Sequence, residues 1–158
     1  ERRYKILDVF ISVAAHICRG GDLDVIGRTM TRMNELTHVK PIVNQAEDQI
    51  IGHIIYIDNF GNVVSNISQK LFKSVAKGRE VLILARSTKF NKVYSSYSEA
   101  INFDIPKENR EMEGKKIALF NSSDFLELAI YKSNPLSVGC ASSLFGLKYL
   151  DTLTLKFL

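Results

Sequence analysis

Two short polar segments carry residue types that suit the binding of a small molecule. The first is DNFGN at residues 58–62, with Ser65 and Asn66 just beyond it. The carboxylate of Asp58 accepts hydrogen bonds from an ammonium group, and the amide of Asn62 both donates to and accepts from the edge of a heterocycle. Tight hairpin turns require the same residue types. This segment alone therefore predicts either a binding loop or a plain turn.

The second segment is NSSDFLELA, which follows the apolar run KKIALF. Asp124 followed three residues later by Glu127 resembles a capping box, and this spacing predicts a helix over residues 125–130. The free N–H groups at the start of that helix, with Ser122 and Ser123 beside them, would hold a carboxylate. The plain alternative is a well-capped helix that packs on a sheet.

Metal and redox chemistry find little support in the sequence. None of the three histidines pairs with a cysteine or an acidic residue at the spacing of metal ligands. Cys18 and Cys140 lie far apart and outside any Cys-x-x-Cys pair, which is typical of reduced thiols in a cytoplasmic protein. The glycine-containing segments lack the spacing of phosphate loops. We therefore predict no metal, no cofactor and a cytoplasmic location.

The composition is that of a globular protein and argues against two classes of partner, nucleic acids and membranes. Of 158 residues, 46% are hydrophobic and 24% are charged. The net charge of +4 is compatible with a nucleic-acid partner, but the basic residues are spread over the chain among acidic ones, with no arginine-rich run and no interleaved aromatic residues. No apolar stretch approaches the roughly 20 residues of a membrane span. We predict neither a nucleic-acid nor a membrane partner. The start ERRYK, without Met, predicts a chain that begins inside a longer gene product.

The elements that must position these residues change in type near Pro41. Apolar residues at helical spacing predict an amphipathic helix over residues 8–19, which ends at Gly20-Gly21. Lys40-Pro41 is typical of a linker, because the residue before a proline avoids the helical conformation. Beyond it, runs rich in β-branched residues predict strands at residues 50–57, 62–67, 81–85, 117–120 and 152–157, with a short helix at 68–75.

The order of these elements predicts the fold class. No strand–helix alternation of the parallel kind is sustained, so the fold is mostly β with a few helices. We expect residues 42–158 to form an antiparallel β barrel or sandwich. Residues 1–41 are predicted to be the helical tail of a preceding α/β domain, together with a linker.

Four segments in one order resemble a known family. VFISVAAHICRGGDLDVIG, IIGHIIYIDNFGNVVSNI, KIALFNSSDFLELAI and ASSLFGLKYLDTLTLKF are similar to segments of the S-adenosyl-L-methionine hydroxide adenosyltransferases, relatives of fluorinase and chlorinase. The resemblance implies an amino-terminal α/β domain, of which only the last helical part is present, and a complete carboxy-terminal β domain. It also implies a homotrimer in which the site lies at the subunit interface.

The resemblance implies a reaction and a set of contacts. Hydroxide displaces methionine at the adenosyl 5′ carbon and forms adenosine and L-methionine. Asp58 matches the acid that holds the methionine ammonium, and Asn62 matches the carboxamide that reads adenine. Ser122, with Ser123 beside it, matches the hydroxyl that holds the methionine carboxylate. Tyr97 matches an aromatic residue that stacks on adenine.

Three departures from the family pattern bear on activity. Lys5 stands where the family hydrolases carry a histidine that activates water, and lysine is a poor base near neutral pH unless burial lowers its pKa. Val64 stands where the halogenating enzymes carry tryptophan, which disfavours fluorinase chemistry. Inserts occur at residues 101–113 and 135–140. A hydrolase is therefore one interpretation, and a binding module that has lost its activity is the other.

Overall fold

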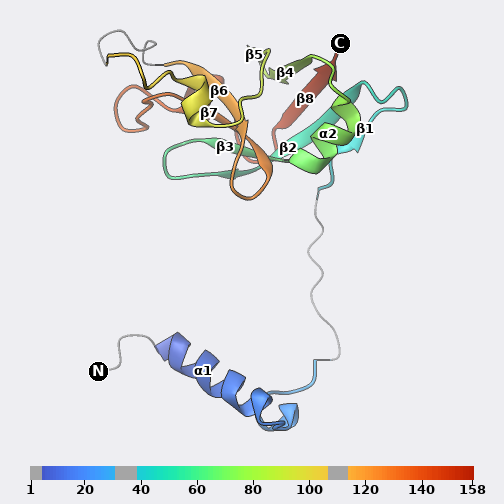
Figure 1. The fold of residues 1–158 in the computed structure, drawn as a ribbon, viewed down its shortest axis with the longest axis vertical. Coiled ribbons are helices and arrows are strands. Elements are labelled where there is room, and N and C mark those ends of the chain that lie inside the picture. Colours follow the sequence, from blue (N-terminus) through green and yellow to red (C-terminus); the bar gives the residue numbers. More distant parts are fainter. Residues whose placement is uncertain (1–4, 31–38, 107–113) are drawn as a thin grey trace. The chain divides into compact units, whose positions relative to one another are not determined.

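The computed structural model of the chain describes residues 5–30, 39–106 and 114–158 (Figure 1). The residues sort into two compact units, residues 1–37 and 38–158, and each is described by itself. In the first unit, helix α1 (Lys5–Cys18) precedes the 3-10 helix η1 (Leu23–Val25). The predicted amphipathic helix is confirmed. It ends where Gly20 adopts a left-handed conformation with φ 74°.

The second unit is built from short strands and shorter helices. Its strands are β1 (Ile42–Val43), β2 (Gln49–Ile57), β3 (Val63–Ser68), β4 (Val81–Ala85), β5 (Thr88–Phe90), β6 (Lys116–Phe120), β7 (Phe125–Ile130) and β8 (Thr152–Phe157). Its helices are α2 (Gln69–Ala76), α3 (Tyr97–Ala100) and α4 (Ala141–Phe145).

The strands form one antiparallel sheet that curls into a nearly closed barrel. Their order is β5-β4-β8-β2-β3-β7-β6, and β1 pairs with β2 outside this path. The two end strands approach each other through Tyr94, whose N–H donates to the carbonyl of Ala118 at 2.8 Å and which forms a bridge to Leu119 of β6. Curling brings the edges together and so covers strand edges that would otherwise be exposed. The predicted mostly antiparallel β fold is confirmed.

Alternating side chains fill the barrel. Leu153, Leu155 and Phe157 of β8 point inward, and so do Leu126 and Leu128 of β7, which are fully buried. A second, smaller apolar cluster covers the outer face of β6 and β7. Its members come from the α3 segment and from those two strands: Ala100, Ile101, Ile117, Leu119 and Ala129. Helix α3 is therefore fixed against the outside of the barrel.

The predicted helix over residues 125–130 is wrong, because these residues form strand β7. Asp124 adopts a left-handed conformation with φ 62°, whereas a helix N-cap needs an extended backbone. Buried Leu126 and Leu128 flank the half-buried Glu127, which is a period of two and not the helical period. The spacing of Asp124 and Glu127 therefore imitated a capping box inside a β hairpin.

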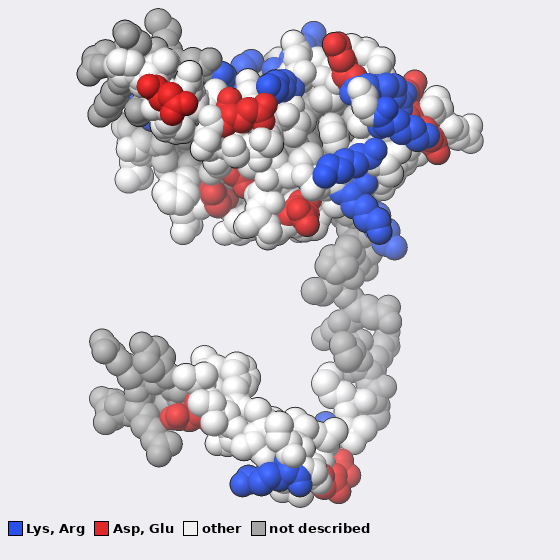
Figure 2. Space-filling view, in the orientation of Figure 1, with Lys and Arg blue, Asp and Glu red and all other residues white. Residues whose placement is uncertain are grey.

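The other predicted elements are confirmed. Strands β2, β3, β4, β6 and β8 lie within a residue or two of the predicted ranges, and α2 begins after Ser68, whose hydroxyl accepts the N–H of Leu71 at 3.2 Å. In Figure 2 one group of Lys and Arg side chains lies on the side of the β domain that carries α2, and others are scattered over the rest of the face shown. In the part of the chain that the structure describes, no helix is long and apolar enough to cross a membrane.

Candidate functional site

The loop between β2 and β3 is organised by one carboxylate. Asp58 Oδ1 accepts the N–H groups of Phe60 (2.9 Å) and Asn62 (2.8 Å), and Asp58 Oδ2 accepts the side-chain Nδ2 of Asn62 at 3.0 Å. The backbone closes the loop through Asp58 N–H to the carbonyl of Asn62 at 3.1 Å. The turn function of Asp58 is thus visible, and the same contacts fix the orientation of the Asn62 amide.

Helix α4 packs against this loop at Gly61. Gly61 has φ 77°, and a β-carbon there would collide with the Cys140 side chain. The N–H of Ser142 donates to the Gly61 carbonyl at 2.9 Å, which joins the helix to the loop. Burial raises the pKa of the Cys140 thiol, but the hydroxyl and backbone N–H groups of Ser142 and Ser143 outweigh burial and lower the pKa overall. The loop therefore rests on a fixed support.

The turn between β6 and β7 carries Ser122 and Ser123, both exposed. Asn121 shapes this turn, because its Oδ1 accepts the N–H groups of Ser123 (3.0 Å) and Phe125 (3.2 Å). The carbonyl of Asp124 accepts the N–H of Gln69 at 2.8 Å, which ties the turn to the start of α2. Since no helix begins here, the expected helix N-terminus is absent from these described residues, and the exposed groups that would meet a carboxylate are the Ser122 and Ser123 hydroxyls.

The register of β3 and β7 sets the separation of the loop and the turn. Val63 pairs with Leu128 at the loop end of the two strands, and Ser68 pairs with Phe125 at the turn end. Between those pairs β7 takes three residue steps, which is about 10 Å at about 3.3 Å per residue. Strand β3 takes five steps over the same stretch and is irregular there.

Glu127 lies between the loop and the turn. Its Oε1 accepts the hydroxyl of Tyr97 at 2.9 Å, and its Oε2 accepts Nδ2 of Asn121 at 3.2 Å. Glu127 pairs with Val64 of β3. Because Val63 belongs to the barrel core, Val64 faces the outer side together with Glu127.

Tyr97 lies near the start of β3, just beyond the β2–β3 loop, because its hydroxyl contacts Glu127 and Glu127 pairs with Val64. Burial, the charge and hydrogen bond of Glu127, and the charge of Asp58 together raise the pKa of the Tyr97 phenol, so the phenol remains protonated over the ordinary pH range. The residue is nevertheless 41% exposed. The structure thus leaves part of the Tyr97 surface accessible while its hydroxyl proton is engaged by Glu127.

A network of polar contacts holds the segment that carries Tyr97. The Glu99 carboxylate accepts the N–H and the hydroxyl of Ser95 at 2.6 and 2.7 Å and pairs with Lys92 at 2.8 Å. The hydrogen bond from Lys92, followed by those from Ser95, lowers the pKa of Glu99 to about 2. Ser96 caps α3 by accepting the N–H of Glu99 at 3.2 Å. Tyr97 is therefore placed by a braced segment.

The structure accordingly groups some of the predicted residues more closely than others. Asp58, Asn62 and Tyr97 share one neighbourhood, and the turn with Ser122 and Ser123 is connected to it by the contacts of Asn121 and Glu127. Lys5 is the first residue of α1, and its side chain lies outside the described residues. Residues 107–113 of the longer insert also lie outside them.

Sequence reasoning assigned no place in the site to Asn121 or Glu127. One signal was available for Glu127, namely a carboxylate between two apolar residues of a strand-length run, which must face away from the core. Asn121 had no such signal, because the carboxylate that it contacts becomes its neighbour only when the hairpin forms.

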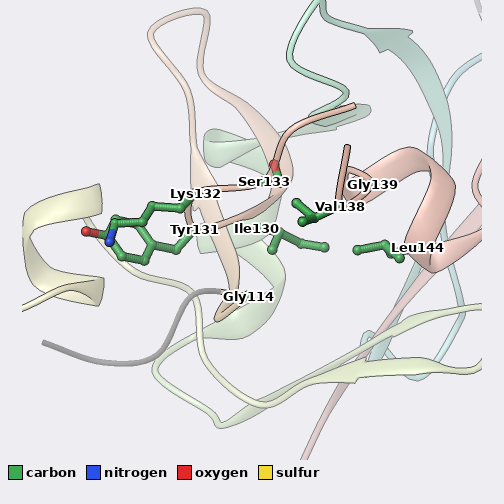
Figure 3. Close-up of a pocket in the computed structure, with 8 residues that line it drawn as sticks. All are labelled: Gly114, Ile130, Tyr131, Lys132, Ser133, Val138, Gly139 and Leu144. Carbon is green, nitrogen blue, oxygen red and sulfur yellow. The ribbon is translucent and has the colours of Figure 1, made fainter. Parts of the chain in front are cut away.

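A separate apolar pocket of about 230 Å³ adjoins the insert at residues 135–140. Ile130, Val138 and Leu144 converge on it, whereas Tyr131 and Lys132 extend away from them (Figure 3). Reciprocal backbone hydrogen bonds between Asn134 and Gly139, at 3.0 and 2.9 Å, close the insert into a compact loop. The residues that line the pocket include no acid–base pair. Among the described residues, no three His, Cys, Asp or Glu side chains are grouped to hold a metal ion.

Two solved structures are similar to this chain. The chain is similar to the crystal structure of an uncharacterized conserved protein from Thermotoga maritima, with 25% identity and a TM-score of 0.62 over 91% of this chain and 49% of that one. It is also similar to a conserved hypothetical protein from Thermus thermophilus, with 19% identity and a TM-score of 0.48 over 96% of this chain and 51% of that one. The chain therefore spans about half the length of these proteins.

No protein of curated function matches the chain. Residues 52–154, however, match the SAM hydroxide adenosyltransferase C-terminal domain. This stretch is more than half of the chain and includes both the β2–β3 loop and the β6–β7 turn. The chain therefore belongs to the SAM hydroxide adenosyltransferase family, as its C-terminal domain.

Proposed function

We propose that this chain supplies the adenine- and methionine-binding half of an S-adenosyl-L-methionine hydrolase. The observation that carries the proposal is the spacing of two polar groups on a domain of this family, the β2–β3 loop with Tyr97 and the β6–β7 turn. They are separated by about 10 Å along β7. A methionine whose ammonium binds the loop and whose carboxylate binds the turn bridges a gap of this order, because the hydrogen bond on each side adds about 3 Å.

The proposed reaction is a displacement at the adenosyl 5′ carbon. The oxygen of hydroxide forms a bond to C5′ while the C5′–S bond breaks, and its electron pair returns to sulfur. The sulfonium loses its positive charge and becomes the thioether of L-methionine, and adenosine is the other product. Water supplies the hydroxide, so one proton is released per turnover. Positioning of the reactants is the contribution we assign to this half.

Each site residue has a proposed contact. The amide of Asn62, held by Asp58, reads the edge of adenine, and the accessible surface of Tyr97 stacks on its face. Asp58 Oδ1 and Oδ2 already accept hydrogen bonds within the loop, so the methionine ammonium would use their remaining lone pairs. The Ser122 hydroxyl, with Ser123 beside it, receives the methionine carboxylate.

The proposed site needs a second wall. By family resemblance, we propose that the protein forms a homotrimer, in which the amino-terminal domain of one subunit covers the C-terminal domain of its neighbour. We propose a cytoplasmic enzyme whose partner is the small-molecule substrate, with no further cofactor. The mass of the full-length protein in solution, measured by light scattering, tests the assembly, and a monomer would contradict it.

A binding module without activity is the second candidate. The departure at Lys5 favours it, since an unperturbed lysine is protonated near neutral pH and so is a poor base for activating water. Both candidates require the ligand to bind. They differ in turnover, so formation of adenosine by the full-length protein supports the hydrolase, and tight binding without adenosine supports the module.

Calorimetric titration of the full-length protein with S-adenosyl-L-methionine tests the contacts. Asp58→Asn keeps an acceptor for the loop N–H groups but removes the charge, and Ser122→Ala removes one hydroxyl. Each should weaken binding by about 1–3 kcal/mol, the usual cost of losing one partner of a charged hydrogen bond. Ser74→Ala, at an exposed serine of α2, is the matched control and should change nothing. Unchanged affinity in both site variants would contradict the assignment.

A further inference from the structure

Glu127 lies between the two polar groups of the proposed site, on a strand that is paired on both sides. It lies in the middle of β7, between the fully buried Leu126 and Leu128. Its backbone pairs with Leu119 of β6 on one side and with Val64 of β3 on the other. The carboxylate therefore projects from a backbone that is held from both sides and by the core.

The groups that Glu127 holds belong to shorter elements. Tyr97 begins the four-residue helix α3, and Asn121 begins the β6–β7 turn. The two oxygens of Glu127 divide these partners, with the Tyr97 hydroxyl on Oε1 and the Asn121 amide on Oε2. Within residues 39–106 and 114–158, no Lys or Arg forms an ion pair with Glu127. The partners of Glu127 that the structure describes are thus two neutral protein donors, one near each end of the proposed ligand.

The direction of these hydrogen bonds limits what each partner offers to a ligand. The Tyr97 phenol donates its only proton to Glu127, so its oxygen meets other groups only as an acceptor, and its ring is fixed in orientation. Asn121 gives one amide hydrogen to Glu127 while its Oδ1 shapes the turn that carries Ser122 and Ser123. One carboxylate thereby sets both the aromatic surface and the turn.

We propose that Glu127 is a positioning residue of the ligand site, which fixes the Tyr97 ring and the β6–β7 turn relative to each other through one hydrogen bond to each. This inference rests on the proposed function, because it assigns the adenine end to Tyr97 and the carboxylate end to the turn. Preorganisation of the two ends lowers the ordering cost of binding a ligand that must touch both.

The inference is tested by exchanging the hydrogen-bond donor and acceptor between Glu127 and Asn121. The affinity of the full-length protein for S-adenosyl-L-methionine is measured for each variant. Glu127→Gln removes the charge that strengthens both hydrogen bonds and replaces one acceptor oxygen by a donor, so at most one of the two bonds keeps its direction. Asn121→Asp sets two carboxylates against each other but keeps the Oδ1 acceptor of the turn. Each single change should weaken binding about fivefold to twentyfold, as expected for one net hydrogen bond. The double variant restores a donor–acceptor pair and should bind within about threefold of wild type.

Two further variants separate positioning from general stability. Glu47→Gln makes the same charge change at an exposed ion pair with Lys77 and should bind like wild type. Tyr97→Phe keeps the ring but removes the hydroxyl, so its loss of affinity should be smaller in the Glu127→Gln background than in wild type. Thermal unfolding of each variant is measured in parallel, because rescue of affinity by the double variant is not expected from a merely structural role.

The possible results lead to different conclusions. Rescue by the double variant supports the positioning role. Single variants that bind like wild type, a double variant no better than the weaker single, or full additivity of Tyr97→Phe with Glu127→Gln would overturn it while leaving the proposed function intact. A wild-type protein that does not bind S-adenosyl-L-methionine overturns the proposed function and this inference with it.

Discussion

Asp58 shows how one side chain serves a turn and a proposed ligand at once. Its oxygens accept three hydrogen bonds from within the β2–β3 loop, and these bonds orient the Asn62 amide. A carboxylate has about four acceptor positions, so capacity remains for an ammonium group. The plain turn and the binding loop, which the sequence left as alternatives, are therefore compatible with one another at the level of single atoms.

Glu99 should make the stability of the β domain depend on acidic pH. Its pKa in the folded protein is about 2, below the ordinary value of 4.5. A lowered pKa contributes stability that is present above pH 4.5 and is lost as the pH falls toward 2. We expect the free energy of unfolding, measured by urea titration at several pH values, to fall less steeply over this window in Glu99→Gln than in wild type. Equal slopes would contradict the role of Glu99 in bracing the α3 segment.

At the scale of elements, the sequence predicted the sheet well and one hairpin poorly. Strands such as β2 and β8 carry long runs or clear alternation of apolar residues, and these patterns depend only on which face is buried. Strand β7 was missed because a local cue, the pair Asp124 and Glu127, competed with a short alternating run. Tertiary pairing of β7 with both β6 and β3 decides the outcome, and no local pattern contains that information.

The candidate site was predictable in part for the same reason. The residues of the β2–β3 loop are contiguous, so their types and spacing identified them. The role of Glu127 depends on partners 30 residues away at Tyr97 and 6 residues away at Asn121, which meet only in the folded barrel. A carboxylate site was predicted near Ser123 because a helix was expected to begin there. No helix begins there, so that physical reason is wrong. The assignment of Ser122 now depends on its hydroxyl and on family membership.

The contact between the β2–β3 loop and α4 should tolerate no side chain at Gly61. Gly61→Ala combines a left-handed backbone with a collision against Cys140, and we expect a loss of about 2–4 kcal/mol in the free energy of unfolding. Gly78→Ala is the control, since Gly78 has φ 83° with open space around it, and it should cost only about 1–2 kcal/mol. The comparison uses denaturant titration of both variants. Equal losses would show that the loop does not rest on α4.

At the scale of the whole molecule, this chain is one part of a proposed two-walled site. It spans about half the length of the Thermotoga maritima protein to which it is similar. The described residues of the β domain offer recognition groups, and no water-activating base has been assigned among them. Binding and chemistry are therefore divided, in our account, between this domain and an amino-terminal domain.

The chain of 158 residues alone should consequently have negligible hydrolase activity. Without the second wall, the sulfonium centre stays in water and the positioning on which the rate depends is lost. Chromatography of S-adenosyl-L-methionine incubated with the purified chain should show no adenosine beyond that in a protein-free control. Turnover by the chain alone would contradict the division between the two walls.

The central claim is tested most directly by turnover of the full-length protein in water enriched in oxygen-18. S-adenosyl-L-methionine is added, and the products are separated and weighed by mass spectrometry. We predict L-methionine and adenosine in equal amounts, with one heavy oxygen in each adenosine at its 5′ position, because the C5′–O bond forms with oxygen from water. Absence of adenosine above the protein-free control, or adenosine without the heavy oxygen, would contradict the proposed hydrolysis.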